Sequence, residues 1–98
     1  MIIVTGSITS QPEHAAQVER LCLDHVHWSR QEPGCLLHSV HRDVEDSLRF
    51  VFIEQWADRD ALAAHFAVSA SFEFVGTATA LASVGPTIEI YEATETRV

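Results

Sequence analysis

The feature that most constrains this chain is the four-residue sequence Glu32-Pro33-Gly34-Cys35, where one kind of periodicity gives way to another. Before it, apolar residues recur every three or four positions, which is typical of an amphipathic helix. After it, apolar and polar residues alternate, which indicates strands. Because a Pro-Gly pair ends a helix and reverses the chain, the sequence predicts a helix that leads directly into a hairpin.

The other segments complete the order strand, helix, strand, strand, helix, strand. Ser10 stands three residues before Glu13, which predicts a capping box at the start of the long helix. Asp58 is expected to be the N-cap of the later helix, and Gly85 is expected to end an alanine-rich helical stretch. The expected strands are residues 2–9, 35–42, 49–56 and 87–91, with a hairpin loop over 43–47 and helices that end near residues 32, 66 and 84.

This order of elements predicts an α+β fold of the ferredoxin-like type (βαββαβ), in which helices pack on one face of an antiparallel sheet. A length of 98 residues suits one domain, which we expect to span residues 1–98. We find no internal repeat and no linker in the sequence.

Both faces of the strand before Ala57 carry large apolar side chains. Phe52 and Trp56 lie on one face, and Val51 and Ile53 lie on the other. Because both faces are apolar, the sequence pattern of this strand does not decide which face meets the helices. Because the helices cover only one face, the other is predicted to pack on a second copy of the chain, giving a homodimer in which each subunit keeps its own cavity.

Composition narrows the possible partners. The formal net charge is −8, with six arginines and no lysine, which disfavours binding to nucleic acid or to anionic membranes. The absence of lysine also excludes Schiff-base chemistry. No apolar run approaches the roughly 20 residues that span a bilayer, and the start lacks a basic leader, so a cytoplasmic protein is expected. Cys22 and Cys35 are expected to be buried thiols, with a reactive thiol as the alternative.

Two ionisable residues stand among apolar neighbours and are candidates for proton transfer. His65 follows two alanines on the later helix, and its imidazole could exchange a proton near neutral pH. The alternative is a buried histidine held by one hydrogen bond. Glu54 lies between Phe52 and Trp56 on one strand face, where it is either a base with a raised pKa or the partner of an arginine.

Further candidates lie on the long helix and in the hairpin. His25 and Trp28 lie on or near the inward side of the helix, where core packing is the alternative role. The spacing of the six histidines predicts no metal site, because His25 and His27 diverge by about 200° on a helix and His38 and His41 point to opposite faces of a strand. No glycine-rich phosphate loop is present, so no cofactor is predicted.

Together these residues resemble the antibiotic biosynthesis monooxygenase domain family of the dimeric α/β-barrel superfamily. The resemblance covers nearly the whole chain, and its landmarks are the opening strand, Glu32-Pro33-Gly34-Cys35, the Arg42-Asp43 hairpin, the run from Phe50 through Glu54-x-Trp56, and Ala64-His65. It implies a homodimer with a substrate cleft beside the helices of each subunit. Members that resemble this chain include monooxygenases that oxidise quinols or polyphenolic polyketides with neither flavin nor metal.

The resemblance also implies roles for individual residues. His65 and Trp56 would be catalytic, with His65 transferring the proton. The substrate-binding residues would be His25, Trp28, His38, Phe52 and Glu54. One branch of the superfamily degrades haem with an Asn, a Trp and a His, and those positions correspond to Gly6, His65 and Val75 here, so none is retained. A non-oxidative isomerase and a small-molecule-binding dimer without turnover are the alternatives.

Overall fold

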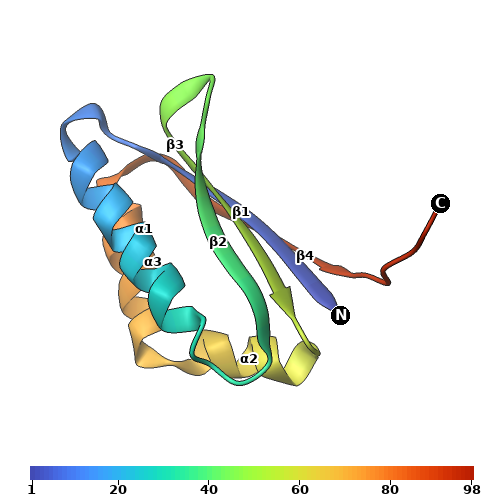
Figure 1. Ribbon diagram of the computed structural model, residues 1–98. Coiled ribbons are helices and arrows are strands. Elements are labelled where there is room, and N and C mark those ends of the chain that lie inside the picture. The colour runs from blue at the N-terminus through green and yellow to red at the C-terminus, as the bar shows by residue number, and fades with distance from the viewer.

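A computed structural model describes residues 1–98 and contains an antiparallel sheet with the strand order β2-β3-β1-β4. The strands are β1 (Ile2–Ser10), β2 (Cys35–Asp43), β3 (Asp46–Trp56) and β4 (Ala82–Glu92). The helices are α1 (Ala15–Ser29), α2 (Arg59–Ala67) and α3 (Ser69–Leu81), with a short 3-10 turn, η1 (Pro12–His14), before α1. The helices α1 and α3 lie side by side against one face of the sheet (Figure 1). This arrangement confirms the ferredoxin-like α+β fold.

The inner face of the sheet is the one that carries the aromatic residues of β3. Phe50, Phe52, Glu54 and Trp56 are all buried, whereas Ile53 is partly exposed on the outer face. The strand alternation therefore placed these four side chains together correctly. The structure also answers the question that the alternation left open, because this is the face that the helices cover.

Two apolar clusters hold the helices to the sheet. The larger consists of Ile8, Val18, Cys22, Val26, Phe50, Phe52 and Ala78. The smaller consists of Ile2, Val4, Trp56 and Leu62. In β3, Glu54 stands between the members of the two clusters, and the register pairs it with Val4 of β1. A polar zone therefore lies between two apolar ones.

The predicted capping box before α1 is wrong. Ser10 is the last residue of β1, where it pairs with Ala82 of β4, and its hydroxyl donates a hydrogen bond to the Gln11 carbonyl. Pro12 then starts the 3-10 turn, and α1 begins only at Ala15. Sheet pairing thus uses the residue that the local sequence pattern assigned to the helix.

The end of the second helical segment is also earlier than predicted. The helix α3 stops at Leu81, and β4 starts at Ala82 rather than at residue 87. Pairing with the end of β1 holds this segment extended, and the Ser83 hydroxyl adds a hydrogen bond of 3.3 Å to the Thr9 carbonyl. Gly85 has a φ of 82° beside the irregular register of this strand pair, so it lies inside the strand instead of ending the helix.

Asp58 is confirmed as the N-cap of α2, because its Oδ1 accepts the Ala61 N–H at 2.8 Å. The break between α2 and α3 falls at Val68, and the Ser71 hydroxyl closes it by donating to the His65 carbonyl at 2.8 Å. No single helix is long and apolar enough to cross a membrane, and α2 and α3 meet that test only when taken together across a bend of 69°.

The Pro-Gly turn packs tightly on the start of α2. Gly34 has a φ of 80°, which favours glycine, and a Cβ atom there would lie 2.5 Å from the Cβ of Ala61. The Gly34 carbonyl accepts the Ala57 N–H at 2.8 Å. The turn that carries Glu32 is therefore fixed against the helix that carries His65.

Candidate functional site

Three imidazoles meet between the helices and the sheet. His25 comes from α1, His38 from β2 and His65 from α2. Their ring centroids are 5.3 Å apart for His25 and His38, 5.3 Å for His25 and His65, and 5.7 Å for His38 and His65. One ring nitrogen of each lies within 4.8 Å of those of the other two. The fold thus brings together histidines that are far apart in the sequence.

Glu54 lies beside this group and is only 7% exposed. Its Oε1 accepts the indole N–H of Trp56 at 2.9 Å and lies 3.3 Å from Nε2 of His38. Burial alone raises the pKa of Glu54, but the adjacent His38 and the Trp56 N–H outweigh it, so the pKa of this carboxyl lies below its ordinary value. The expectation of a raised pKa or an arginine partner is therefore wrong: His38 and Trp56 take the place of an arginine.

His65 is oriented by a carboxylate. Its Nδ1 lies 3.1 Å from both carboxylate oxygens of Glu32. Because a carboxylate only accepts hydrogen bonds, Nδ1 carries the hydrogen in the neutral ring, and Nε2 keeps a free lone pair. The Trp56 ring lies 4.7 Å from the His65 ring and limits its movement.

His25 is neutral at physiological pH. Burial, reinforced by the neighbouring His38 and His65, lowers the pKa of His25 to about 4, although Glu54 acts in the opposite direction. Its ring stacks on Phe74 of α3, with centroids 4.0 Å apart and planes 9° apart. The stacking fixes the plane of this imidazole.

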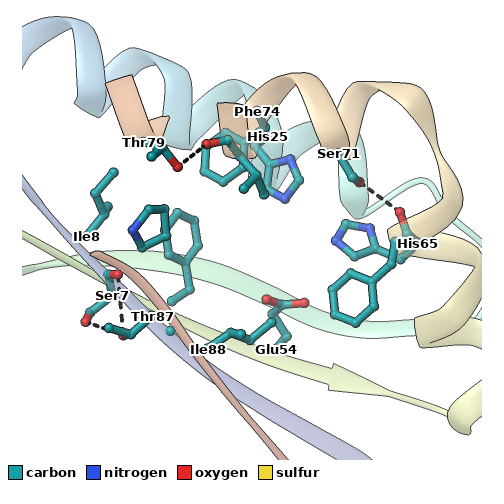
Figure 2. Close-up of a pocket in the computed structure, with 15 residues that line it drawn as sticks. Ser7, Ile8, His25, Glu54, His65, Ser71, Phe74, Thr79, Thr87 and Ile88 are labelled. Atoms are coloured by element: carbon teal, nitrogen blue, oxygen red, sulfur yellow. Dashed lines mark hydrogen bonds between the residues drawn. The ribbon is translucent and has the colours of Figure 1, made fainter. Parts of the chain in front are cut away.

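A cavity of about 260 Å³ opens beside these groups. Figure 2 shows Glu54 directed from the sheet towards the helices, from which His25 and His65 face it. Phe52 and Phe74 supply aromatic wall, with ring centroids 5.9 Å apart. The cavity combines a small polar end with flat apolar surfaces, which is the pattern of a small-molecule site.

The structure places the seven residues singled out from the sequence in three settings. The cavity is lined by His25, Phe52, Glu54 and His65. His38 and Trp56 are buried behind the cavity, and both contact Glu54, which lines it. Trp28 is 52% exposed and lies in a separate depression between α1 and α3.

Glu32 and Phe74 belong to the site but were not predicted to. Glu32 was noted only as part of the turn sequence, and no spacing rule links it to His65, from which 33 positions separate it. Phe74 lies in a helix whose apolar residues are spread around its circumference, so the sequence pattern gave no preferred face. The positions that match the haem-degrading branch, Gly6, His65 and Val75, all line the cavity as well.

The fold and this cavity define a small α+β protein with a cavity between its helices and the inner face of its sheet. Residues 1–75 match the model of the antibiotic biosynthesis monooxygenase family, and the chain therefore belongs to that family.

Similar proteins agree with this assignment. The uncharacterized protein sll1783 of Synechocystis is 33% identical over 96 residues, which is 98% of this chain and 65% of that protein, so the chain spans just under two thirds of the relative. A crystal structure named as a candidate antibiotic biosynthesis monooxygenase from Deinococcus radiodurans is 29% identical with a TM-score of 0.94, covering 100% of this chain and 97% of that one. Another, named antibiotic biosynthesis monooxygenase, is 33% identical with a TM-score of 0.88, covering 97% and 100%.

Proposed function

We propose that this chain is a cofactor-independent monooxygenase that oxidises a quinol or polyphenolic aromatic molecule with dioxygen. The observation that carries the proposal is the convergence of His25, His65 and Glu54 on a cavity with aromatic walls. A hydroxylated aromatic ring matches both halves of this cavity, because it can pack against the wall that Phe52 and Phe74 form while its hydroxyl group meets the polar end.

The proton acceptor in this proposal is Nε2 of His65. Glu32 holds the opposite nitrogen, so the free lone pair is the one left for a phenolic hydroxyl group. Glu54 accepts the Trp56 N–H and stays ionised, which stabilises the imidazolium that forms. Trp56 is fully buried and acts through Glu54 and His65, so we assign it a positioning role.

The substrate supplies all the electrons in this reaction. Loss of the phenolic proton gives an electron-rich anion that transfers an electron to dioxygen, and the two radicals then combine at a ring carbon. The peroxide formed at that carbon takes back a proton, and loss of the remaining C–H proton as the oxygen–oxygen bond breaks converts the ring C–H carbon to a carbonyl carbon. The second oxygen atom leaves as water. The protein contributes deprotonation, orientation and exclusion of bulk water.

The outer face of the sheet supports the homodimer that belongs to this proposal. Leu37, Ile53 and Tyr91 are each 38–50% exposed there, and a second copy would bury them. Sedimentation of the wild type as a dimer and of Ile53→Glu as a folded monomer would support this assembly. We also place the reaction in the cytoplasm, where the free thiols Cys22 and Cys35 stay reduced.

Oxygen uptake with a panel of quinols and anthrones tests the proposed reaction. We expect uptake above the spontaneous rate in the wild type and a loss of about 10²–10⁴-fold in His65→Ala, the range for removal of a general base. His41→Ala is the matched control, because His41 is exposed on β2 and bonds only to Ser39. Trp56→Phe should lower the rate less than His65→Ala does.

The same panel can contradict the proposal. If aromatics quench tryptophan fluorescence and saturate the cavity but no substrate consumes oxygen, the chain is a binding protein and the oxygenase proposal is wrong. Equal rates in His65→Ala and His41→Ala would remove His65 from the proton-transfer role.

A further inference from the structure

The proposed reaction uses one imidazole as a proton acceptor, yet the site contains three. His25, His38 and His65 come from three different elements, and one nitrogen of each lies within 4.8 Å of the others. Neutral imidazoles can donate hydrogen bonds to one another, but no hydrogen bond joins any two of these three rings. Their convergence therefore requires a further explanation.

The geometry points to a divalent transition-metal site in which His25, His38 and His65 are the three protein ligands and the open position faces the cavity. Three histidines with one free position are the ligand set of many open zinc sites. Metal–nitrogen bonds of about 2.0–2.1 Å in a tetrahedral site separate the nitrogens by about 3.3 Å. The three nitrogens now lie within 4.8 Å of one another. Side-chain rotations that move each of them by about an ångström would bring them to the tetrahedral spacing.

The surroundings of His38 are the strongest independent support. Its ring is fully buried, with 2% of the residue exposed, and neither nitrogen has a hydrogen-bond partner. The Oε1 of Glu54 lies 3.3 Å from Nε2, which is an ion-pair contact and not a hydrogen bond. Buried polar groups are nearly always hydrogen-bonded, so a buried imidazole that makes no hydrogen bond and lies beside two others is suited to coordinate an ion.

The groups around the three rings match those around known metal ligands. Glu32 accepts the Nδ1–H of His65, which leaves Nε2 for the metal and reproduces the carboxylate–histidine–metal arrangement. Phe74 stacks on His25 and fixes its plane. These contacts orient two of the three ligands before any ion binds.

The local charge also favours a cation. Glu54 and Glu32 both adjoin the imidazoles, and no arginine forms an ion pair with either carboxylate. Arg30 lies nearby but donates to the backbone carbonyl of His38, at 2.9 Å. A divalent ion would offset the negative charge that this buried region otherwise carries.

The donor set indicates the class of metal. Three imidazole nitrogens suit zinc, copper, nickel and iron, whereas magnesium and calcium prefer oxygen ligands. The inference does not depend on the oxygenase reaction. A bound ion would occupy the His65 nitrogen that the proposed reaction uses, so the two uses exclude each other in one subunit.

Metal titration of the tag-free protein, dialysed against chelator, tests the site without any measurement of turnover. We expect about one Zn²⁺ per chain by calorimetry, and visible absorption bands of tetrahedral Co²⁺ that excess Zn²⁺ removes. His25→Asn, His38→Asn and His65→Asn should each weaken Zn²⁺ binding by more than about 100-fold, and Glu32→Gln by about 10–100-fold, the range for outer-shell partners.

His27→Asn and His41→Asn are the controls, because both residues are exposed and stand on the same elements as two of the ligands. They should bind Zn²⁺ as the wild type does. Circular dichroism confirms the fold of each variant, and the Co²⁺ spectrum of the wild type gives a result even if a ligand variant fails to fold. Absence of tetrahedral Co²⁺ bands, or equal loss of Zn²⁺ binding in ligand and control variants, would overturn the proposal.

Discussion

The interior contains two regions built on the same strands but with opposite chemistry. Around Phe50 and Ile8 the helices meet the sheet through apolar side chains alone. Four residues further along β3, the same layer contains Glu54, with the imidazoles of His25, His38 and His65 beside it. The apolar region gains stability by excluding water, whereas the polar region keeps ionisable groups in a desolvated place, which favours chemistry and costs stability.

The contrast shows how such a small domain can hold a site of this kind. The second apolar cluster, around Trp56 and Leu62, closes the other end of the layer. The polar groups are therefore held between two packed regions. Substitutions in the packed regions should change stability most, and those in the polar region should change stability little or even raise it.

The largest effect is expected from Phe50→Ala. Phe50 is buried in the larger apolar cluster and lies outside the cavity, so truncation leaves a void and should lower the free energy of unfolding by about 3–5 kcal/mol. Urea denaturation measures this change. A loss below 1 kcal/mol would mean that the cluster does not carry the stability assigned to it.

Acid should destabilise the protein through His25. Its pKa of about 4 in the fold lies below the ordinary value of 6.5, so the unfolded chain takes up the proton first as the pH falls. The contribution of His25 to the free energy of unfolding is therefore complete above pH 6.5. It is lost as the pH falls towards 4, at no more than about 1.4 kcal/mol per pH unit. Urea midpoints in the presence of chelator should show this slope in the wild type and a shallower one in His25→Asn. Identical slopes would contradict the desolvation of His25.

Trp56→Phe separates packing from hydrogen bonding at the edge of the polar region. The ring still fills most of the space, but Glu54 loses the N–H that it accepts. We expect a loss of about 1–3 kcal/mol of unfolding free energy and a higher pKa for Glu54. Denaturation at pH 7, with a carbon-13 NMR titration of Glu54, would show both. No change in the pKa would mean that the indole contributes packing alone.

The smallest effect is expected from His38→Leu, and it has the opposite sign. The substitution removes two buried nitrogens that make no hydrogen bond, at similar volume, but it also takes away the imidazole that lies 3.3 Å from the buried Glu54 carboxylate. Because these two effects oppose each other, stability should stay within about 1 kcal/mol of the wild type or rise. Thermal melting in the presence of chelator measures it. A loss above 2 kcal/mol would show that His38 is a structural member of the interior.

The sequence predicted elements better than it predicted the site. Alternation placed Phe52, Glu54 and Trp56 on one face, and Asp58 marked a helix start, because both signals are local. The predicted start of the last strand was wrong, because pairing with β1 extends this strand back to Ala82. The three histidines lie on three elements, so spacing within any one element carries no sign of their meeting.

The glycine of the turn has a consequence for the chemistry. Gly34 touches Ala61 so closely that a methyl group would force the turn and α2 apart. Glu32 moves with the turn, and His65 moves with the helix. A Gly34→Ala substitution would therefore separate the His65 imidazole from the Glu32 carboxylate, and the free lone pair on Nε2 would no longer be held in one direction. A glycine, which has no side chain, thus determines the orientation of the histidine.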